Sequence, residues 1–137
     1  PREELLRELA TECGVSDRIE FSGRVSYDEI GAAYAEADVF VHPGIWPEPL
    51  NRTVMEAMQS GLPVVCTEIG GPPEVIPDAE LLCEPANPSA LADTIETARE
   101  SRDAVGNRNR THIYDQYDPQ IIVPQIINLY ETLSGLQ

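Results

Sequence analysis

Short apolar runs alternate with amphipathic stretches along the middle of the chain. Continuous apolar runs at Asp38–His42 and Pro63–Thr67 have the composition of buried strands, and we expect a further strand at Ala79–Cys83. Residues 51–60 and 88–99 repeat apolar side chains at helical spacing. Strands that alternate with helices pair in parallel through right-handed crossovers, with helices on both faces of the sheet. The pattern therefore predicts an α/β fold built on a parallel sheet.

The segments before residue 38 predict further elements of the same kind. Apolar side chains recur at helical spacing up to Gly14, a residue type that commonly ends helices. A short strand is expected at Ile19–Phe21, and a helix at Tyr27–Ala37 that Ser26 begins, with Glu29 completing a capping box. A helix leading into a parallel strand normally follows another strand. We therefore expect that the first strand is missing and that residues 1–137 are one domain of a longer, two-domain protein.

The remaining segments are turns and helices. Residues 70–73 read as a turn into a short helix that ends near Ile76. Asp118 is placed to cap a last helix, with Pro119 suited to its first turn. Pro124 removes a backbone donor inside that helix, so we expect a kink or a restart there.

Acidic residues strongly outnumber basic ones. The chain has 24 Asp and Glu against nine basic residues, all Arg, and a formal net charge of −15. Such a surface is a poor partner for nucleic acid or for an anionic membrane. We interpret the acidic excess as a well-hydrated, halophile-like surface suited to a salt-rich cytoplasm.

Cysteine usage and hydropathy point to a cytoplasmic protein. Cys13, Cys66 and Cys83 are odd in number and lack C-x-x-C spacing, which is typical of free thiols in a reducing compartment. The chain contains no apolar run of membrane-spanning length and opens on no signal peptide. We therefore expect no direct insertion into a membrane.

The loop after His42 carries the most distinctive polar residue. Ligands of open parallel sheets bind outside the carboxyl ends of the strands, where loops lead into helices. Pro47 and Pro49 restrict the backbone on both sides of Glu48, so the Glu48 carboxylate has little freedom to lose on binding. Glu48 is thus a preorganised hydrogen-bond acceptor.

The helix after this loop offers complementary groups. Its first turn, from about Arg52 to Val54, presents unpaired N–H groups and a positive dipole end that favour a phosphate. Glu56 points away from the core face that Val54 and Met58 form on a helical wheel. Taken alone, Glu56 could be a solvated helix residue, and Glu48 a carboxylate that gains from the helix dipole. Together they predict a ligand shaped like a nucleotide sugar.

Several segments of the chain, taken in order, resemble one family. They are Arg18–Val25, Ala37–Pro43, Glu48–Gly61 with Pro63–Val65, and Gly70–Gly71 with Glu74–Ile76. In this order they resemble the C-terminal, donor-binding half of retaining GT-B glycosyltransferases, particularly glycosyltransferase family 4 (group 1). The resemblance implies a Rossmann-like sheet and transfer of a sugar from a nucleoside diphosphate with retention at the anomeric carbon. It implies neither a metal nor a cofactor, because the nucleotide sugar is a substrate and protein donors stabilise the departing diphosphate.

The resemblance also implies a role for each position that matches the family motif, with Glu48 as the catalytic one. By this resemblance Glu48 would bind hydroxyls of the transferred sugar, and Glu56 would bind the ribose hydroxyls. The backbone N–H groups of Leu50 and Asn51 would approach the sugar, and those of Arg52 and Thr53 would bind the diphosphate. The main chain near Val25 would contact the base.

The chain departs from the family in two respects. Position 51 usually carries Gly, and Asn51 brings a side chain to where the backbone meets the sugar, although Asn is also a good N-cap for the helix that follows. The basic residues that clamp the diphosphate, and the half that binds a glycan, lipid or small-molecule acceptor, belong to segments outside this chain. The isolated piece is therefore expected to be inactive.

Other interpretations remain open at this stage. A GT-B-type nucleotide-sugar epimerase would keep a nucleotide pocket with different acid and base groups, and a non-catalytic doubly wound binding module would share the architecture. A dinucleotide-binding oxidoreductase is disfavoured, because no G-x-G-x-x-G follows a strand. His42 lacks a second ligand at metal spacing, so we expect no metal site. Trp46 either lines the acceptor cleft or packs within its loop.

Overall fold

The computed structural model describes residues 2–135, which divide after Ile30 into two compact units, each described by itself. The first unit contains helix α1 (Arg2–Glu12) and the 3₁₀ turn η1 (Ser16–Arg18). Gly14 follows α1 with a φ of 68°, the left-handed conformation that ends many helices. The predicted helix and its stop are therefore both present.

The strand predicted at Ile19–Phe21 is wrong for the residues that the structure describes. Ile19 has extended backbone angles, φ −119° and ψ 125°, but the segment pairs with no other strand. A strand is completed by ladder hydrogen bonds to a neighbour, and the described part of the first unit offers no such neighbour. Extended geometry alone does not make a sheet.

Helix α2 (Ile30–Glu36) begins later than the sequence predicted. The hydroxyl of Ser26 donates to the carboxylate of Glu29, whereas a capping box would join each side chain to the backbone N–H of the other residue. The N–H groups of Glu29 and Ile30 both donate to the carbonyl of Ser26, so residues 27–29 form a turn that leads into the helix. The predicted helix is therefore present, but it begins three residues later, and Ser26 meets Glu29 through a side-chain bond instead of the predicted capping box.

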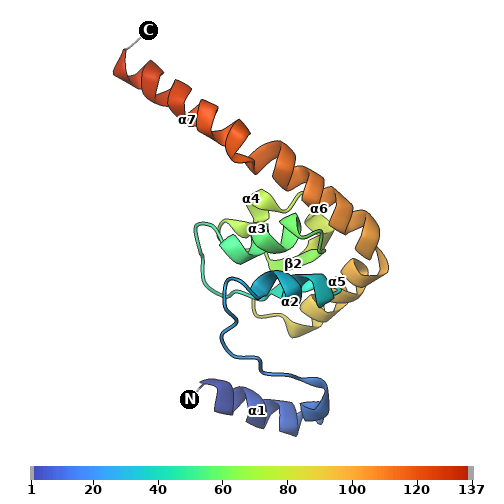
Figure 1. The fold of residues 1–137 in the computed structure, drawn as a ribbon. Helices are drawn as coiled ribbons and strands as arrows, with labels where there is room; N and C mark the ends of the chain where they lie inside the picture. Colours follow the sequence, from blue (N-terminus) through green and yellow to red (C-terminus); the bar gives the residue numbers. More distant parts are fainter. Residues whose placement is uncertain (1, 136–137) are drawn as a thin grey trace. The chain divides into compact units, whose positions relative to one another are not determined.

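The second unit is built on a parallel sheet. The three strands are β1 (Phe40–His42), β2 (Val64–Thr67) and β3 (Leu82–Cys83), paired in parallel in the order β1-β2-β3. The helices and turns around them are α3 (Arg52–Gln59), α4 (Pro72–Val75), η2 (Ala79–Leu81), α5 (Pro88–Glu100), α6 (Arg102–Tyr117) and α7 (Pro119–Ser134). Figure 1 shows α3 and α4 on one side of β2 and α5 on the other, which confirms the predicted α/β class.

The third strand is shorter than predicted. Residues 79–81 form a 3₁₀ turn, in which the N–H of Leu81 donates to the carbonyl of Asp78. Only Leu82 and Cys83 reach the ladder with β2. The turn takes the backbone donors that a longer strand would have used.

The core lies between β2 and the helices that cover it. All four residues of β2 are buried, and Val54, Ala57 and Met58 of α3 are fully buried. Val54 and Met58 thus form the core face that the helical wheel predicted. Burial raises the pKa of the Cys66 thiol in β2 to about 12, so this cysteine is a small apolar core residue.

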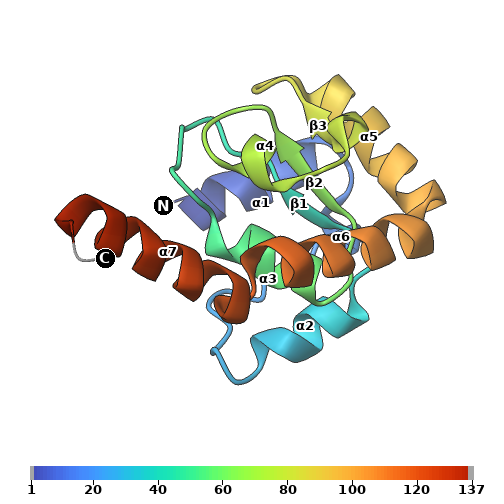
Figure 2. The same ribbon diagram turned by 90° about the horizontal axis from the view of Figure 1, so that it is seen from above.

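Helix α6 packs across the turn between α3 and β2, as Figure 2 shows from above. A Cβ at Gly106 would collide with the carbonyl oxygen of Gly61, so the two backbones meet directly. The side-chain amide of buried Asn109 donates to the carbonyl of Leu62 at 2.8 Å. Arg110 donates to the carbonyl of Ser60 at 2.7 Å. The carbonyls of Ser60 and Leu62, in the turn that follows α3, are therefore satisfied by side chains of α6.

The last helix begins as predicted. The carboxylate of Asp118 accepts a hydrogen bond from the N–H of Gln120 at 2.7 Å, and Pro119 occupies the first turn. α7 runs through Pro124 without a break, so the chain does not restart there. No helix within residues 2–135 combines the length and the apolar character needed to cross a membrane.

Candidate functional site

The loop between β1 and α3 is anchored to the next loop of the sheet. It leaves the carboxyl end of β1 and enters α3 at Asn51. The hydroxyl of Thr67, at the end of β2, donates to the carbonyl of Gly44. The N–H of Gly71 donates to the carbonyl of Glu48 at 2.8 Å. Contacts on either side of Pro47 thus hold the loop against its neighbour.

Two glycines allow this close approach. A Cβ at Gly70 would lie 2.5 Å from the carbonyl oxygen of Glu48, and Gly70 also has a φ of 71°. A Cβ at Gly71 would collide with the carbonyl oxygen of Pro49. Because any side chain at these positions would displace the backbone of the Glu48 loop, the glycines determine where Glu48 lies.

The Glu48 side chain is exposed and is held from one side by Asn51. The Nδ2 group of Asn51 donates to Oε2 of Glu48 at 3.0 Å. The same Nδ2 lies 3.3 Å from Nδ1 and 3.2 Å from Nε2 of His42, the last residue of β1. Oδ1 of Asn51 accepts from the N–H of Thr53 at 3.0 Å and caps α3. The expected N-cap is therefore present, and it also contacts the proposed catalytic carboxylate.

Glu56 lies one turn further along α3 and is less exposed than a surface glutamate. Its carboxylate accepts from the hydroxyl of Tyr34 on α2 at 3.3 Å and pairs with Arg52 at 3.4 Å. Its side chain is only 26% exposed. Burial, followed by the negative charge of Glu56, raises the pKa of Tyr34, which therefore stays a neutral donor near pH 7. Glu56 is therefore not an ordinary, fully solvated helix glutamate.

A cavity of about 290 Å³ opens beside Glu56. Arg52, Met55 and Glu56 of α3 contribute to one wall, and Tyr114 and Tyr117 of α6 contribute to the other. It combines a carboxylate, a guanidinium and aromatic surface, which suits a ligand with both polar and flat parts. Sequence analysis did not predict the wall formed by α6, because α6 is distant from α3 along the chain.

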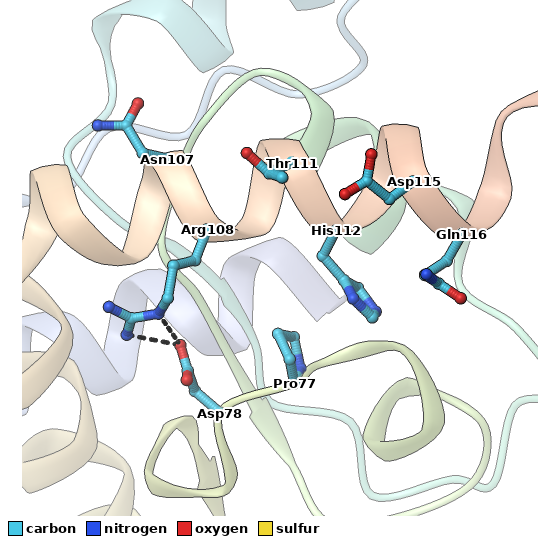
Figure 3. A pocket seen from close by; sticks show the side chains of 8 residues that line it. All are labelled: Pro77, Asp78, Asn107, Arg108, Thr111, His112, Asp115 and Gln116. Atoms are coloured by element: carbon cyan, nitrogen blue, oxygen red, sulfur yellow. Dashed lines mark hydrogen bonds and ion pairs between the residues drawn. The ribbon is translucent and has the colours of Figure 1, made fainter.

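Figure 3 shows a larger cavity, of about 460 Å³, between α6 and the segment at Pro77 and Asp78. Arg108 spans it and forms an ion pair with Asp78 at 2.8 Å. None of the residues that the sequence singled out for ligand binding lines it. The charges of Arg108 and Asp78 neutralise one another, and Asp115 adds a further carboxylate to the lining.

The structure brings together six of the seven predicted site residues. Glu48, Leu50, Asn51, Arg52, Thr53 and Glu56 lie in the Glu48 loop and the first turns of α3. Val25 belongs to the first unit, which is described by itself. Tyr34 and Gly71 were missed as site residues, because their roles depend on contacts with residues distant in the sequence.

Two further residues of the same loop are exposed although they are apolar. Ile45 is 71% exposed and Trp46 is 76% exposed. Trp46 therefore does not pack within its loop, which was one of its two interpretations. Within residues 2–135, no group of three or more His, Cys, Asp or Glu side chains is arranged to hold a metal ion.

Residues 1–116 match the sequence profile of the family described as glycosyl transferases group 1. The chain belongs to the group 1 glycosyltransferase family. This confirms the resemblance in the sequence, and solved GT-B glycosyltransferases share the fold of the chain.

Individual relatives of this glycosyltransferase chain agree with that membership. It is 30% identical over 131 residues to an uncharacterized glycosyltransferase of Methanocaldococcus jannaschii, covering 92% of this chain and 33% of the relative. It is 42% identical over 82 residues to the GDP-mannose-dependent alpha-(1-6)-phosphatidylinositol monomannoside mannosyltransferase of Mycobacterium tuberculosis, covering 56% of this chain and 21% of the relative.

A solved relative contains a nucleotide sugar. Anabaena HepE in complex with UDP-glucose matches with a TM-score of 0.81 and 28% identity, covering 97% of this chain and 36% of the HepE chain. The group 1 chain described here thus spans about a third of the length of such relatives.

Proposed function

We propose that this chain is the donor-binding domain of a retaining glycosyltransferase, which transfers a sugar from a nucleoside diphosphate to an acceptor. One observation carries the proposal. The Glu48 carboxylate is held at the carboxyl edge of the parallel sheet, directly before the N-terminus of α3. Ligands of open parallel sheets bind at this edge, and helix N-termini favour phosphate groups.

The first turn of α3 would bind the charged part of the donor. The N–H groups of Arg52 and Thr53 lie in this turn, and the Arg52 guanidinium, whose side chain is 77% exposed, adds a full positive charge. These donors would stabilise the diphosphate as it departs, without a metal ion. The N–H groups of Leu50 and Asn51 would approach the transferred sugar, and the Glu48 carboxylate would accept hydrogen bonds from its hydroxyl groups.

Glu56 would bind the ribose. A carboxylate accepts hydrogen bonds from two neighbouring hydroxyl groups, and Tyr34 and Arg52 hold that of Glu56 in place. The main chain near Val25 would meet the base. UDP and GDP are the first nucleotides to test, because the relatives named above include a UDP-glucose complex and a GDP-mannose-dependent enzyme.

The acceptor would bind to the remaining part of the full-length enzyme. Exposed Trp46, in the same loop as Glu48, is placed to meet it. We also place the enzyme in the cytoplasm, in agreement with its free cysteines Cys13, Cys66 and Cys83.

The test uses the full-length protein and two conservative variants. Glu48→Gln should lower turnover by roughly 100-fold or more with little change in affinity for free UDP or GDP, because Glu48 contacts the sugar. Glu56→Gln should mainly weaken nucleotide binding, by roughly tenfold, because a charged acceptor is lost. Calorimetric titration with each nucleotide and assays of sugar transfer measure the two effects.

A matched control is Glu96→Gln on α5, where the carboxylate pairs with Arg99 on the surface. This change should alter neither quantity. Equal losses of nucleotide affinity in the Glu48 and Glu56 variants would contradict the division of roles. Inversion at the anomeric carbon, detected by NMR of the product, would contradict the retaining mechanism.

A further inference from the structure

The tetrapeptide Glu-Pro-x-Asn occurs twice in the chain, each time between a strand and a helix. Residues 48–51 precede α3, and residues 84–87 precede α5. In both copies the asparagine Nδ2 donates to Oε2 of the glutamate three residues earlier, at 3.0 Å for Asn51 and 3.1 Å for Asn87. The shared geometry indicates that the bridge arises from the local sequence.

Both asparagines also cap their helices, and this fixes the orientation of each amide. Oδ1 of Asn51 accepts from the N–H and the hydroxyl of Thr53. Oδ1 of Asn87 accepts from the N–H of Ala90 at 3.0 Å. Because the oxygen is committed to the helix, the NH₂ group must face the glutamate.

Among residues 2–135, the first copy has a third participant and the second does not. The ring of His42 lies 3.2 to 3.3 Å from Nδ2 of Asn51, on the end of β1. Gly44 leaves room for that ring, since a Cβ there would lie 3.0 Å from Nε2 of His42. The amide of Asn51 is therefore in contact with the helix, the strand end and Glu48 at once.

We infer that Asn51 is a positioning residue that holds the Glu48 carboxylate in its sugar-binding orientation, with His42 behind it. This inference rests on the proposed function of Glu48. An exposed glutamate samples several rotamers and must give them up on binding. The bond from Asn51 engages Oε2, and Oε1 is the oxygen that we assign to the sugar hydroxyl. Asn51 thus acts through its side chain, in addition to the backbone contact proposed above.

Two substitutions in the full-length protein separate this role from helix capping. Asn51→Ser keeps a side-chain oxygen that caps α3 but removes the NH₂ donor. It should lower kcat/KM for the nucleotide sugar by roughly tenfold, the value of one hydrogen bond to a charged group, with unchanged affinity for the free nucleotide. Asn51→Asp also keeps the cap, but it places a second carboxylate beside Glu48 and should lower kcat/KM further.

The second tetrapeptide supplies the matched control. Asn87→Ser and Asn87→Asp make the same chemical changes at the cap of α5, and Glu84 receives the same bond there. These variants should leave kcat/KM unchanged. An equal loss in the Asn87 and Asn51 variants would show that a general change in helix capping is responsible, and it would overturn the inference.

A double-mutant cycle identifies the partner of Asn51. If Asn51 acts through Glu48, Asn51→Ser should have no further effect on kcat/KM in a Glu48→Ala background, where no acceptor for the Asn51 amide remains. Additive losses would overturn the inference. So would full activity of Asn51→Ser, or a loss of free-nucleotide affinity as large as the loss of kcat/KM.

The same variants distinguish a failure of the proposed function from a failure of the positioning role of Asn51. If Glu48→Gln alone leaves transfer unchanged, the proposed function fails and the inference fails with it. If Glu48→Gln abolishes transfer while Asn51→Ser does not reduce it, only the positioning role is wrong.

Discussion

Gly71 shows how a residue without a side chain can place a functional group. Its N–H donates to the carbonyl of Glu48, and its Cα hydrogen faces the carbonyl oxygen of Pro49. Gly71→Ala should destabilise the protein by about 1–3 kcal/mol, because the Glu48 loop must move to admit a methyl group. A shift of about 1 Å in that loop should lower turnover by roughly 100-fold. Urea unfolding and transfer assays on the full-length variant measure both effects.

Gly31→Ala is the control for Gly71→Ala. Gly31 lies within α2, and a Cβ there would have nothing within 4 Å. Alanine is the better helix former, so stability should hold or rise by about 0.5–1 kcal/mol, with unchanged turnover. If Gly71→Ala behaved in the same way as Gly31→Ala, the close approach of the two loops would not be what places Glu48.

Helix α6 packs against the end of α3 through a buried asparagine. Asn109 is fully buried and its Nδ2 donates to the carbonyl of Leu62, while its Oδ1 has no partner within residues 2–135. Asn109→Ala should lower the free energy of unfolding by about 1–3 kcal/mol, because the Leu62 carbonyl loses its donor and a cavity opens. Denaturant unfolding of the variant measures this change.

Asn107→Ala is the control for that interface. Asn107 lies two residues earlier on α6 and is exposed, so its removal should change the free energy of unfolding by less than about 0.5 kcal/mol. An equal loss of stability in the two variants would mean that the bond to Leu62 does not determine the result, because alanine is the better helix former at both positions.

The acidic surface is a property of the whole molecule. With a formal charge of −15, carboxylates repel one another across the surface at low ionic strength. Raising KCl from about 0.05 M to about 1 M shortens the screening length from more than 10 Å to about 3 Å. The midpoint of thermal unfolding at pH 7 should therefore rise by several degrees, as measured by circular dichroism.

The same experiment near the isoelectric point tests the cause. The isoelectric point from the sequence is about 4.3, where the net charge vanishes and salt has little net repulsion to screen. The rise in midpoint should therefore be smaller there. A rise of equal size at both pH values would indicate that salt acts on the apolar core rather than on the charges.

Features that arise within a few consecutive residues could be predicted from the amino-acid pattern alone. Helical spacing identified α3 and its core face, Asn51 and Asp118 were recognised as caps, and the prolines around Glu48 indicated a restrained loop. Such features depend on backbone geometry and on partners one turn away, so local composition is sufficient to predict them.

Contacts between distant segments became visible in the folded structure and could not be predicted from the sequence. Tyr34 meets Glu56, and Gly71 meets Glu48, although neither pair is close in the sequence. Ile19–Phe21 reads as a strand but has no neighbour with which to pair among the described residues. Hydrogen bonds of this kind need a second segment at the right distance, and its position follows from the packing of the whole core rather than from the pattern of any one stretch.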